Sequence, residues 1–256
     1  MPEITYRFDP EGTSEPKRPA DAAAALALLR AGNEEFVDFF GESRVIDLTP
    51  EELGISLDGF PSPQRPFAAI LGCADARVPI EFIFRCRSNQ LFVVRVAGNV
   101  AGTECLGSLE YAEAQLSESM RVAVVLGHTG CGAVTAAVDA YLDIRTYPDS
   151  PTLRAVVDRI LPAVRVSAVA LAEAYGDSAL ATPAGRDALI ECSVVMNAAL
   201  SATTVRDDLA FPVHYGVFDM ATRRAWIDEP PVDADAYVAL AQRVATADPI
   251  RRILEP

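Results

Sequence analysis

Short apolar runs alternate with helical patterns through the middle of the chain. Three of these runs, 67–72, 91–98 and 121–127, are rich in β-branched and aliphatic side chains. Each run is too short for a stable helix and does not alternate between apolar and polar residues, which is typical of parallel strands buried on both faces. Residues 102–119 and 133–142 have apolar positions at helical spacing. The pattern predicts an α/β fold with a central, mostly parallel β-sheet flanked by helices.

Both ends of the chain depart from this alternation. Residues 1–18 are polar and predict a flexible N-terminal arm, followed by a helical N-terminal region. Residues 151–209 are rich in Ala, Val and Leu at helical spacing and predict two long helices. Residues 214–229 have the apolar, turn, apolar pattern of a C-terminal edge strand with a hairpin return. We expect residues 19–256 to form a single domain.

Composition narrows the class of protein. The 256 residues are 50% hydrophobic, which is enough for one large core. No apolar run approaches the roughly 20 residues of a membrane span, and the polar N-terminus lacks the apolar core of a secretory signal. The net charge of -14 is spread along the chain and would repel nucleic acid. We therefore expect no membrane or nucleic-acid partner and a cytoplasmic location, with the interior of a bacterial microcompartment as the alternative.

Two polar clusters follow two of the predicted strands. Cys73, Asp75 and Arg77 lie after the first run, and His128 and Cys131 lie after the third. Because ligands bind at the carboxyl ends of parallel strands, we expect the two clusters to converge. Two thiolates and one imidazole are a ligand set that favours zinc, and three protein ligands leave a fourth position open, as in catalytic sites. Asp75 is a conditional fourth ligand: it closes the site or pairs with Arg77.

The residues alone leave other interpretations open. Cys73 and Cys131 could form a disulfide, or each could be a small apolar core residue. Asp75 and Arg77 could form only a surface ion pair. The count of five cysteines is odd and lacks the spacing of a secreted disulfide scaffold. The remaining cysteines and the second histidine are interpreted as packing or structural residues: Cys86, Cys105, Cys192 and His214.

Three motifs resemble those of the β-class carbonic anhydrases. They are CADARVP at 73–79, LFVVRVAGN at 91–99 and GHTGCGAV at 127–134. The resemblance implies a lyase that hydrates carbon dioxide reversibly to bicarbonate and a proton by zinc-bound hydroxide. It also implies one zinc ion per chain, held by Cys73, His128 and Cys131.

The resemblance extends to a substrate pocket like that of the plant-like branch. Gln64, Phe92 and Tyr111 match its positions, where an amide orients the substrate and two rings form an apolar slot. Arg85 and Gln90 depart from the acidic residues expected between the motifs, and Tyr111 stands two residues further from the histidine than in the plant enzymes. The pocket rim is therefore less well matched than the metal ligands.

A second branch of the family favours ligation of zinc by the aspartate. Its marker is a tryptophan three residues before the first cysteine, where this chain has Ile70; the sole tryptophan is Trp226. Ala76 replaces the usual serine. We therefore expect the open form, with Asp75 paired to Arg77.

The family implies a homodimer, or a higher homo-oligomer built from dimers, with active sites at the subunit interface. Gln64 would then serve a neighbour's zinc. One alternative function is hydrolysis of carbon disulfide or carbonyl sulfide on the same fold. Another is a non-catalytic zinc-binding scaffold, which the long acidic N-terminal arm suggests.

Overall fold

The computed structural model describes residues 3–12, 18–39, 41, 43–55, 60 and 63–255. Its strands are β1 (Ile4–Phe8), β2 (Arg44–Leu48), β3 (Ala68–Cys73), β4 (Leu91–Val96), β5 (Val122–His128), β6 (Val213–Phe218) and β7 (Ala225–Asp228). Its α-helices are α1 (Ala22–Asp38), α2 (Ile80–Ile83), α3 (Thr103–Leu116), α4 (Gly132–Leu142), α5 (Pro151–Tyr175), α6 (Pro183–Asp208), α7 (Ala234–Ala245) and α8 (Asp248–Leu254). Short 3-10 turns are η1 (Glu51–Leu53), η2 (Ala97–Asn99), η3 (Ile144–Thr146) and η4 (Asp177–Ala181).

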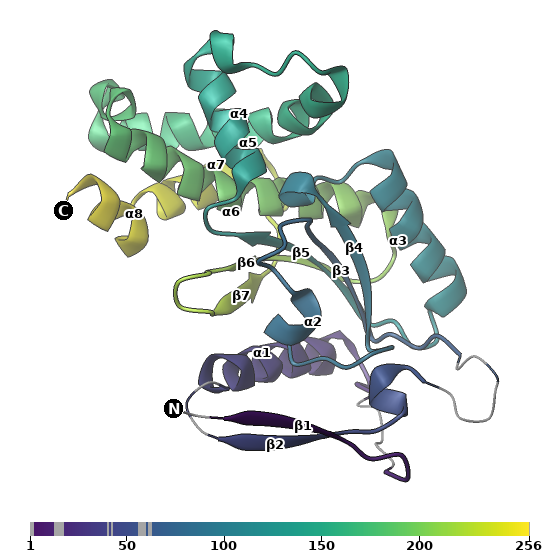
Figure 1. Cartoon of the computed structure of the whole chain (residues 1–256). Coiled ribbons are helices and arrows are strands. Elements are labelled where there is room, and N and C mark those ends of the chain that lie inside the picture. Colours follow the sequence, from purple (N-terminus) through teal and green to yellow (C-terminus); the bar gives the residue numbers. More distant parts are fainter. Residues whose placement is uncertain are drawn as a thin grey trace.

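A five-stranded sheet in the order β4-β3-β5-β6-β7 forms the centre of the molecule (Figure 1). β3 pairs in parallel with β4 and β5, and β5 pairs in parallel with β6, whereas β7 is antiparallel to β6 at the sheet edge. Every residue of β3, β5 and β6 is buried, which explains why β3 and most of β5 are continuous apolar runs in the sequence. The predicted α/β class, with a mostly parallel sheet and a C-terminal edge strand, is confirmed.

Helices cover both faces of this sheet. Successive side chains of a strand point to opposite faces. Ala69 and Leu71 of β3 pack into the cluster formed with α3 to α8, whereas Ala68 and Ile70 pack with α1 and α2. Figure 1 shows α1 and α2 on one side of the sheet and α4 to α8 on the other. Because both faces are covered, the ends of the strands are where ligands can reach the sheet.

The two long helices predicted between residues 151 and 209 are α5 and α6. Pro151 and Pro183 occupy their first turns, where a missing N–H leaves no hydrogen bond unmade. The Thr182 hydroxyl caps α6 by accepting from the Gly185 N–H at 2.9 Å. By length and composition alone, α6 could cross a membrane. However, 72% of its most apolar window is buried inside the fold, and a core helix passes the same test.

The N-terminal segment differs from the prediction. Within the predicted arm 1–18, β1 pairs in parallel with β2, so this part is a strand. Arg7 and Asp47 form an exposed ion pair at 2.6 Å across the two strands. The alternating pattern of β1 was missed because most of its side chains are exposed, so no apolar run marks it. Residues 1, 2 and 13–17 of the arm lie outside the described residues.

The contact between α1 and α2 depends on a glycine. A Cβ atom at Gly32 of α1 would lie 1.8 Å from the Phe84 carbonyl oxygen at the end of α2. We expect Gly32→Ala to lower the free energy of unfolding by about 2–3 kcal/mol, because backbone must move to admit the methyl group. Chemical denaturation would measure this change in the free energy of unfolding. Gly107→Ala in α3 is the control: its Cβ meets nothing within 4 Å, so a gain of about 0.5–1 kcal/mol is expected. Equal effects of the two substitutions would contradict this packing.

Candidate metal centre

The predicted ligands converge at the ends of two neighbouring strands. Cys73 is the last residue of β3, His128 is the last residue of β5, and Cys131 immediately precedes α4. Their ligand atoms all lie within 4.8 Å of one another. All three side chains are buried, with exposed fractions of 4%, 0% and 1%. The pairing of β3 with β5 therefore brings together the three ligands predicted from the sequence.

His128 is oriented to bind a metal ion. Its Nδ1 lies 3.0 Å from the Thr129 carbonyl oxygen, and donating there leaves a lone pair on Nε2. Nε2 is buried and has no hydrogen-bond partner among the described residues. The Asp75 carboxylate lies 3.8 Å away, too far for a hydrogen bond. A buried nitrogen without a partner is costly, and a zinc ion would satisfy it, so the donor set of two sulfurs and one nitrogen fits zinc.

The two cysteines act as a coupled pair. Their sulfurs are 3.9 Å apart, against about 2.05 Å in a disulfide, and both are free thiols. A hydrogen bond from Cys131 lowers the pKa of the Cys73 thiol, whereas the same contact raises the pKa of the Cys131 thiol. The Gly98 N–H also donates to the Cys73 sulfur at 3.3 Å. The Cys73 thiol therefore ionises readily, whereas the Cys131 thiol keeps its proton until a metal ion replaces that proton.

Asp75 faces Arg77 in the turn after β3. The guanidinium donates through Nε at 3.0 Å and Nη2 at 2.6 Å, and the Arg77 backbone N–H donates at 2.9 Å. The guanidinium holds the pKa of the Asp75 carboxyl well below its usual range, so the group is an ionised acceptor. Asp75 is thus paired with Arg77, whereas an open fourth position on the metal and the catalytic roles of both residues stay predictions.

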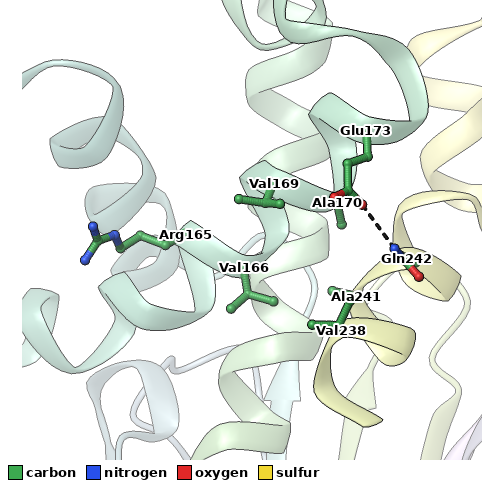
Figure 2. A pocket seen from close by; sticks show the side chains of 8 residues that line it. All are labelled: Arg165, Val166, Val169, Ala170, Glu173, Val238, Ala241 and Gln242. Atoms are coloured by element: carbon green, nitrogen blue, oxygen red, sulfur yellow. Dashed lines mark hydrogen bonds between the residues drawn. The ribbon is translucent and has the colours of Figure 1, made fainter. Parts of the chain in front are cut away.

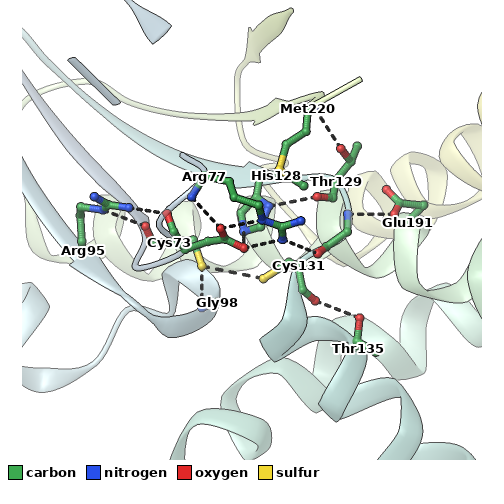
Figure 3. A network of polar contacts seen from close by, with 12 residues as sticks. Cys73, Arg77, Arg95, Gly98, His128, Thr129, Cys131, Thr135, Glu191 and Met220 are labelled. Carbon is green, nitrogen blue, oxygen red and sulfur yellow. Dashed lines mark hydrogen bonds and ion pairs between the residues drawn. The ribbon is translucent and has the colours of Figure 1, made fainter. Parts of the chain in front are cut away.

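Side chains other than the predicted ligands and catalytic residues support the centre, and sequence analysis did not predict their roles; Arg95 and Glu191 are drawn in Figure 3. Arg95 of β4 donates to the Cys73 carbonyl at 3.0 Å and to the Asp75 carbonyl at 2.5 Å. The Asn197 amide of α6 donates to the Gly98 carbonyl at 2.7 Å. Glu191 of α6 accepts from the backbone of the second motif. Arg95 lies within the quoted LFVVRVAGN motif, whereas nothing in the sequence around the two α6 residues marks them.

The predicted substrate residues lie away from this centre in the chain itself. Gln64 precedes β3 and lines a cavity of about 380 Å³ at the opposite end of the sheet. Phe92 pairs with Ala69, four residues before Cys73, so roughly 13 Å of strand separates Phe92 from the strand end. Tyr111 lies on α3 with 55% of its surface exposed. A single chain does not bring these residues to its own metal ligands, and their role at a neighbour's centre stays a prediction.

The other cysteines and the second histidine occupy positions typical of structural residues. Cys105 and Cys192 are buried in the main core, and Cys86 packs against the smaller one. His214 lies buried within β6, and burial lowers the pKa of its imidazole. None of them belongs to a metal-binding group within the described part of the chain.

A separate apolar pocket of about 220 Å³ lies between α5 and α7 (Figure 2). Val166, Val169 and Val238 line it, and Gln242 donates to Glu173 at 3.1 Å on its rim. It contains no cysteine or histidine, so it offers no soft metal ligand.

Comparison with known sequences finds one family. The family described as carbonic anhydrase matches residues 68–222. Carbonic anhydrase 2 of Mycobacterium tuberculosis (strain H37Rv) is 42% identical over 144 residues, which cover 55% of this chain and 63% of that protein. A carbonic anhydrase of Mycolicibacterium smegmatis is 44% identical over 145 residues, covering 57% of this chain and 66% of that protein. The matched segment thus spans just under two thirds of these relatives.

Comparison with solved structures finds the same fold. The β-carbonic anhydrase of Coccomyxa, solved in complex with acetazolamide, superposes with a TM-score of 0.51 at 19% identity, covering 81% of this chain and 86% of that one. The β-carbonic anhydrase CcaA superposes with a TM-score of 0.52 at 19% identity, covering 64% of this chain and 74% of that one. At this level of identity the likeness concerns the fold.

Proposed function

The chain belongs to the carbonic anhydrase family, in the β class, and from this premise we propose that it hydrates carbon dioxide reversibly to bicarbonate and a proton. The observation that carries the proposal is the buried group of Cys73, His128 and Cys131, a set of three zinc ligands that leaves a fourth position for the reaction. Zinc, when bound there, acts as a Lewis acid that makes water ionise at a moderate pH.

The residues of the chain orient the reactants around this centre. Asp75 remains ionised beside Arg77, so its Oδ2 accepts a hydrogen bond from the attacking water and directs the lone pair of the water oxygen toward the substrate. Arg77 donates to both carboxylate oxygens of Asp75 and so fixes the orientation of the group, and Arg95 holds the backbone of the turn that carries both residues. The proton released by hydration passes to buffer.

The substrate slot requires a second copy of the chain. Gln64 and Phe92 lie at the end of the sheet opposite the ligands, and Tyr111 is exposed on α3. In a homodimer these residues would reach the partner's centre, where the amide would orient carbon dioxide and the rings would exclude water. The family resemblance and the exposure of Tyr111 support this arrangement. We also propose a cytoplasmic location, as expected from the sequence.

We expect the hydration rate to rise from neutral toward alkaline pH. Cys73 and Cys131 contribute two negative charges that cancel the charge of a divalent ion, so water there is less acidic than at a site of three neutral imidazoles, where it ionises near pH ~7. Asp75 does not add an opposing step, because Arg77 holds its pKa well below its usual range. Stopped-flow rates of the zinc-loaded protein from about pH 6 to about pH 9 would measure the profile around that value.

The same assay tests the proposed substrate. Carbon disulfide is offered to the same preparation, and we expect carbon dioxide to be the faster substrate. A rate maximum well below neutral pH would be inconsistent with the two-thiolate centre. Hydrolysis of carbon disulfide without hydration of carbon dioxide would replace the proposed activity. Stoichiometric zinc with neither reaction would leave a zinc-binding scaffold.

A further inference from the structure

The turn between His128 and Cys131 sets how two of the three ligands face each other. It contains only Thr129 and Gly130, and it joins a buried strand to a helix. Gly130 has a φ of +63°, the left-handed region in which glycine is favoured. Glycine adopts this conformation without steric cost, so the turn can form locally, and contacts from outside the turn then fix its position.

Two charged side chains of opposite sign hold the turn at Gly130 (Figure 3). The Gly130 N–H donates to Oε1 of Glu191 on α6 at 3.0 Å. The Gly130 carbonyl accepts from Nη2 of Arg77 at 3.4 Å, and the same nitrogen donates to Asp75. The turn is thus fixed between α6 and the Asp75–Arg77 pair.

Burying the Glu191 carboxylate costs desolvation free energy, which its hydrogen bond to the turn can offset. It is half-buried, and within the described chain it forms no ion pair. Burial raises the pKa of its carboxyl, nearby Asp219 and Asp187 raise it further, and the hydrogen bond from Gly130 opposes them. An apolar side chain would be buried here at lower cost but could not accept from the Gly130 N–H, so the acceptor oxygen is the property that the turn uses.

We propose that Glu191 is a positioning residue of the metal centre, which fixes the turn at Gly130 and thereby the placement of His128, Cys131 and Arg77. Without the acceptor, the turn relaxes, the ligands lose their preorganised spacing, and Arg77 loses one of its contacts. The inference rests on zinc binding at this centre and does not depend on which substrate the enzyme takes.

Two variants of similar volume isolate the acceptor. Glu191→Met fills the same space without an oxygen, whereas Glu191→Gln retains one. We expect Glu191→Met to weaken zinc binding about 10- to 100-fold, as is typical for the loss of a partner just outside the ligand set, and Glu191→Gln to bind zinc as the wild type does. The zinc dissociation constant is measured by competition with a chromophoric chelator, on the full-length protein.

Glu113→Met is the matched control. Glu113 of α3 also accepts from backbone N–H groups of a distant segment, at Ala210 and Phe211, but away from the ligands. It should lose stability without losing zinc affinity. Wild-type affinity in Glu191→Met, or equal weakening in Glu191→Met and Glu113→Met, would overturn the proposal. If Glu191→Met does not fold, Glu191→Ala replaces it with the same expected outcomes. A tenfold loss of zinc affinity in Glu191→Gln would also contradict the acceptor role. Tight zinc binding without hydration activity would remove the proposed function and leave this test intact.

Discussion

Replacing Cys73 with serine is expected to abolish stable zinc binding and to reduce carbon dioxide hydration by more than about 100-fold. Loss of a partner outside the ligand set already costs about 10- to 100-fold in metal affinity or activity, and loss of a ligand should cost more. Cys73 is buried beside Cys131, with their sulfurs 3.9 Å apart, and a serine hydroxyl does not replace a thiolate on zinc. Zinc content by atomic absorption and hydration by stopped flow would be measured on the same preparation.

Cys105→Ser is the control for this substitution. Cys105 is a buried thiol in the same core, and burial raises its pKa, but it lies outside the ligand group. The control should keep both zinc and activity. If Cys73→Ser keeps its zinc and its activity, Cys73 does not belong to the centre.

The second large effect is expected from Arg77→Met. The substitution removes the donors that hold the Asp75 carboxylate, whose Oδ2 already lies 3.8 Å from His128 Nε2. We expect Asp75 to turn toward the metal and occupy the fourth position. Hydration should then fall by about 10- to 100-fold while the zinc content stays at one per chain.

A second Asp-x-Arg pair in the chain provides the control for Arg77→Met. Arg145 donates to Asp143 through its side chain at 2.7–3.0 Å and through its backbone N–H at 3.0 Å, in the same local geometry but away from the ligands. Arg145→Met should leave hydration unchanged. Loss of zinc from Arg77→Met, in place of loss of activity alone, would show that Arg77 stabilises the site by another route.

The core of the fold and the ligand set could be predicted from the sequence because their signals are local. Strands β3 and β5 are buried on both faces, so each is an uninterrupted apolar run. Cys73 and His128 end these strands, and because ligands bind at the carboxyl ends of parallel strands, the sequence predicts that the two residues lie close together. The residues themselves left a disulfide open, and the family resemblance favoured zinc.

The parts that were missed depend on contacts between distant segments. Glu191 lies in a helix whose pattern indicates only packing, and its contact with Gly130 spans 61 positions. Strand β1 has mostly exposed side chains, so its composition resembles that of a flexible arm. Helices α7 and α8 were not predicted, although α7 packs against α5. The substrate-binding role predicted for Gln64, Phe92 and Tyr111 requires a second copy of the chain.

The most direct test is to titrate zinc into the metal-free wild-type protein and follow carbon dioxide hydration at alkaline pH. If one ion held by Cys73, His128 and Cys131 supports the reaction, activity should rise linearly and stop rising at one zinc per chain. Activity that is independent of zinc, or a fully loaded protein without hydration activity, would contradict the account.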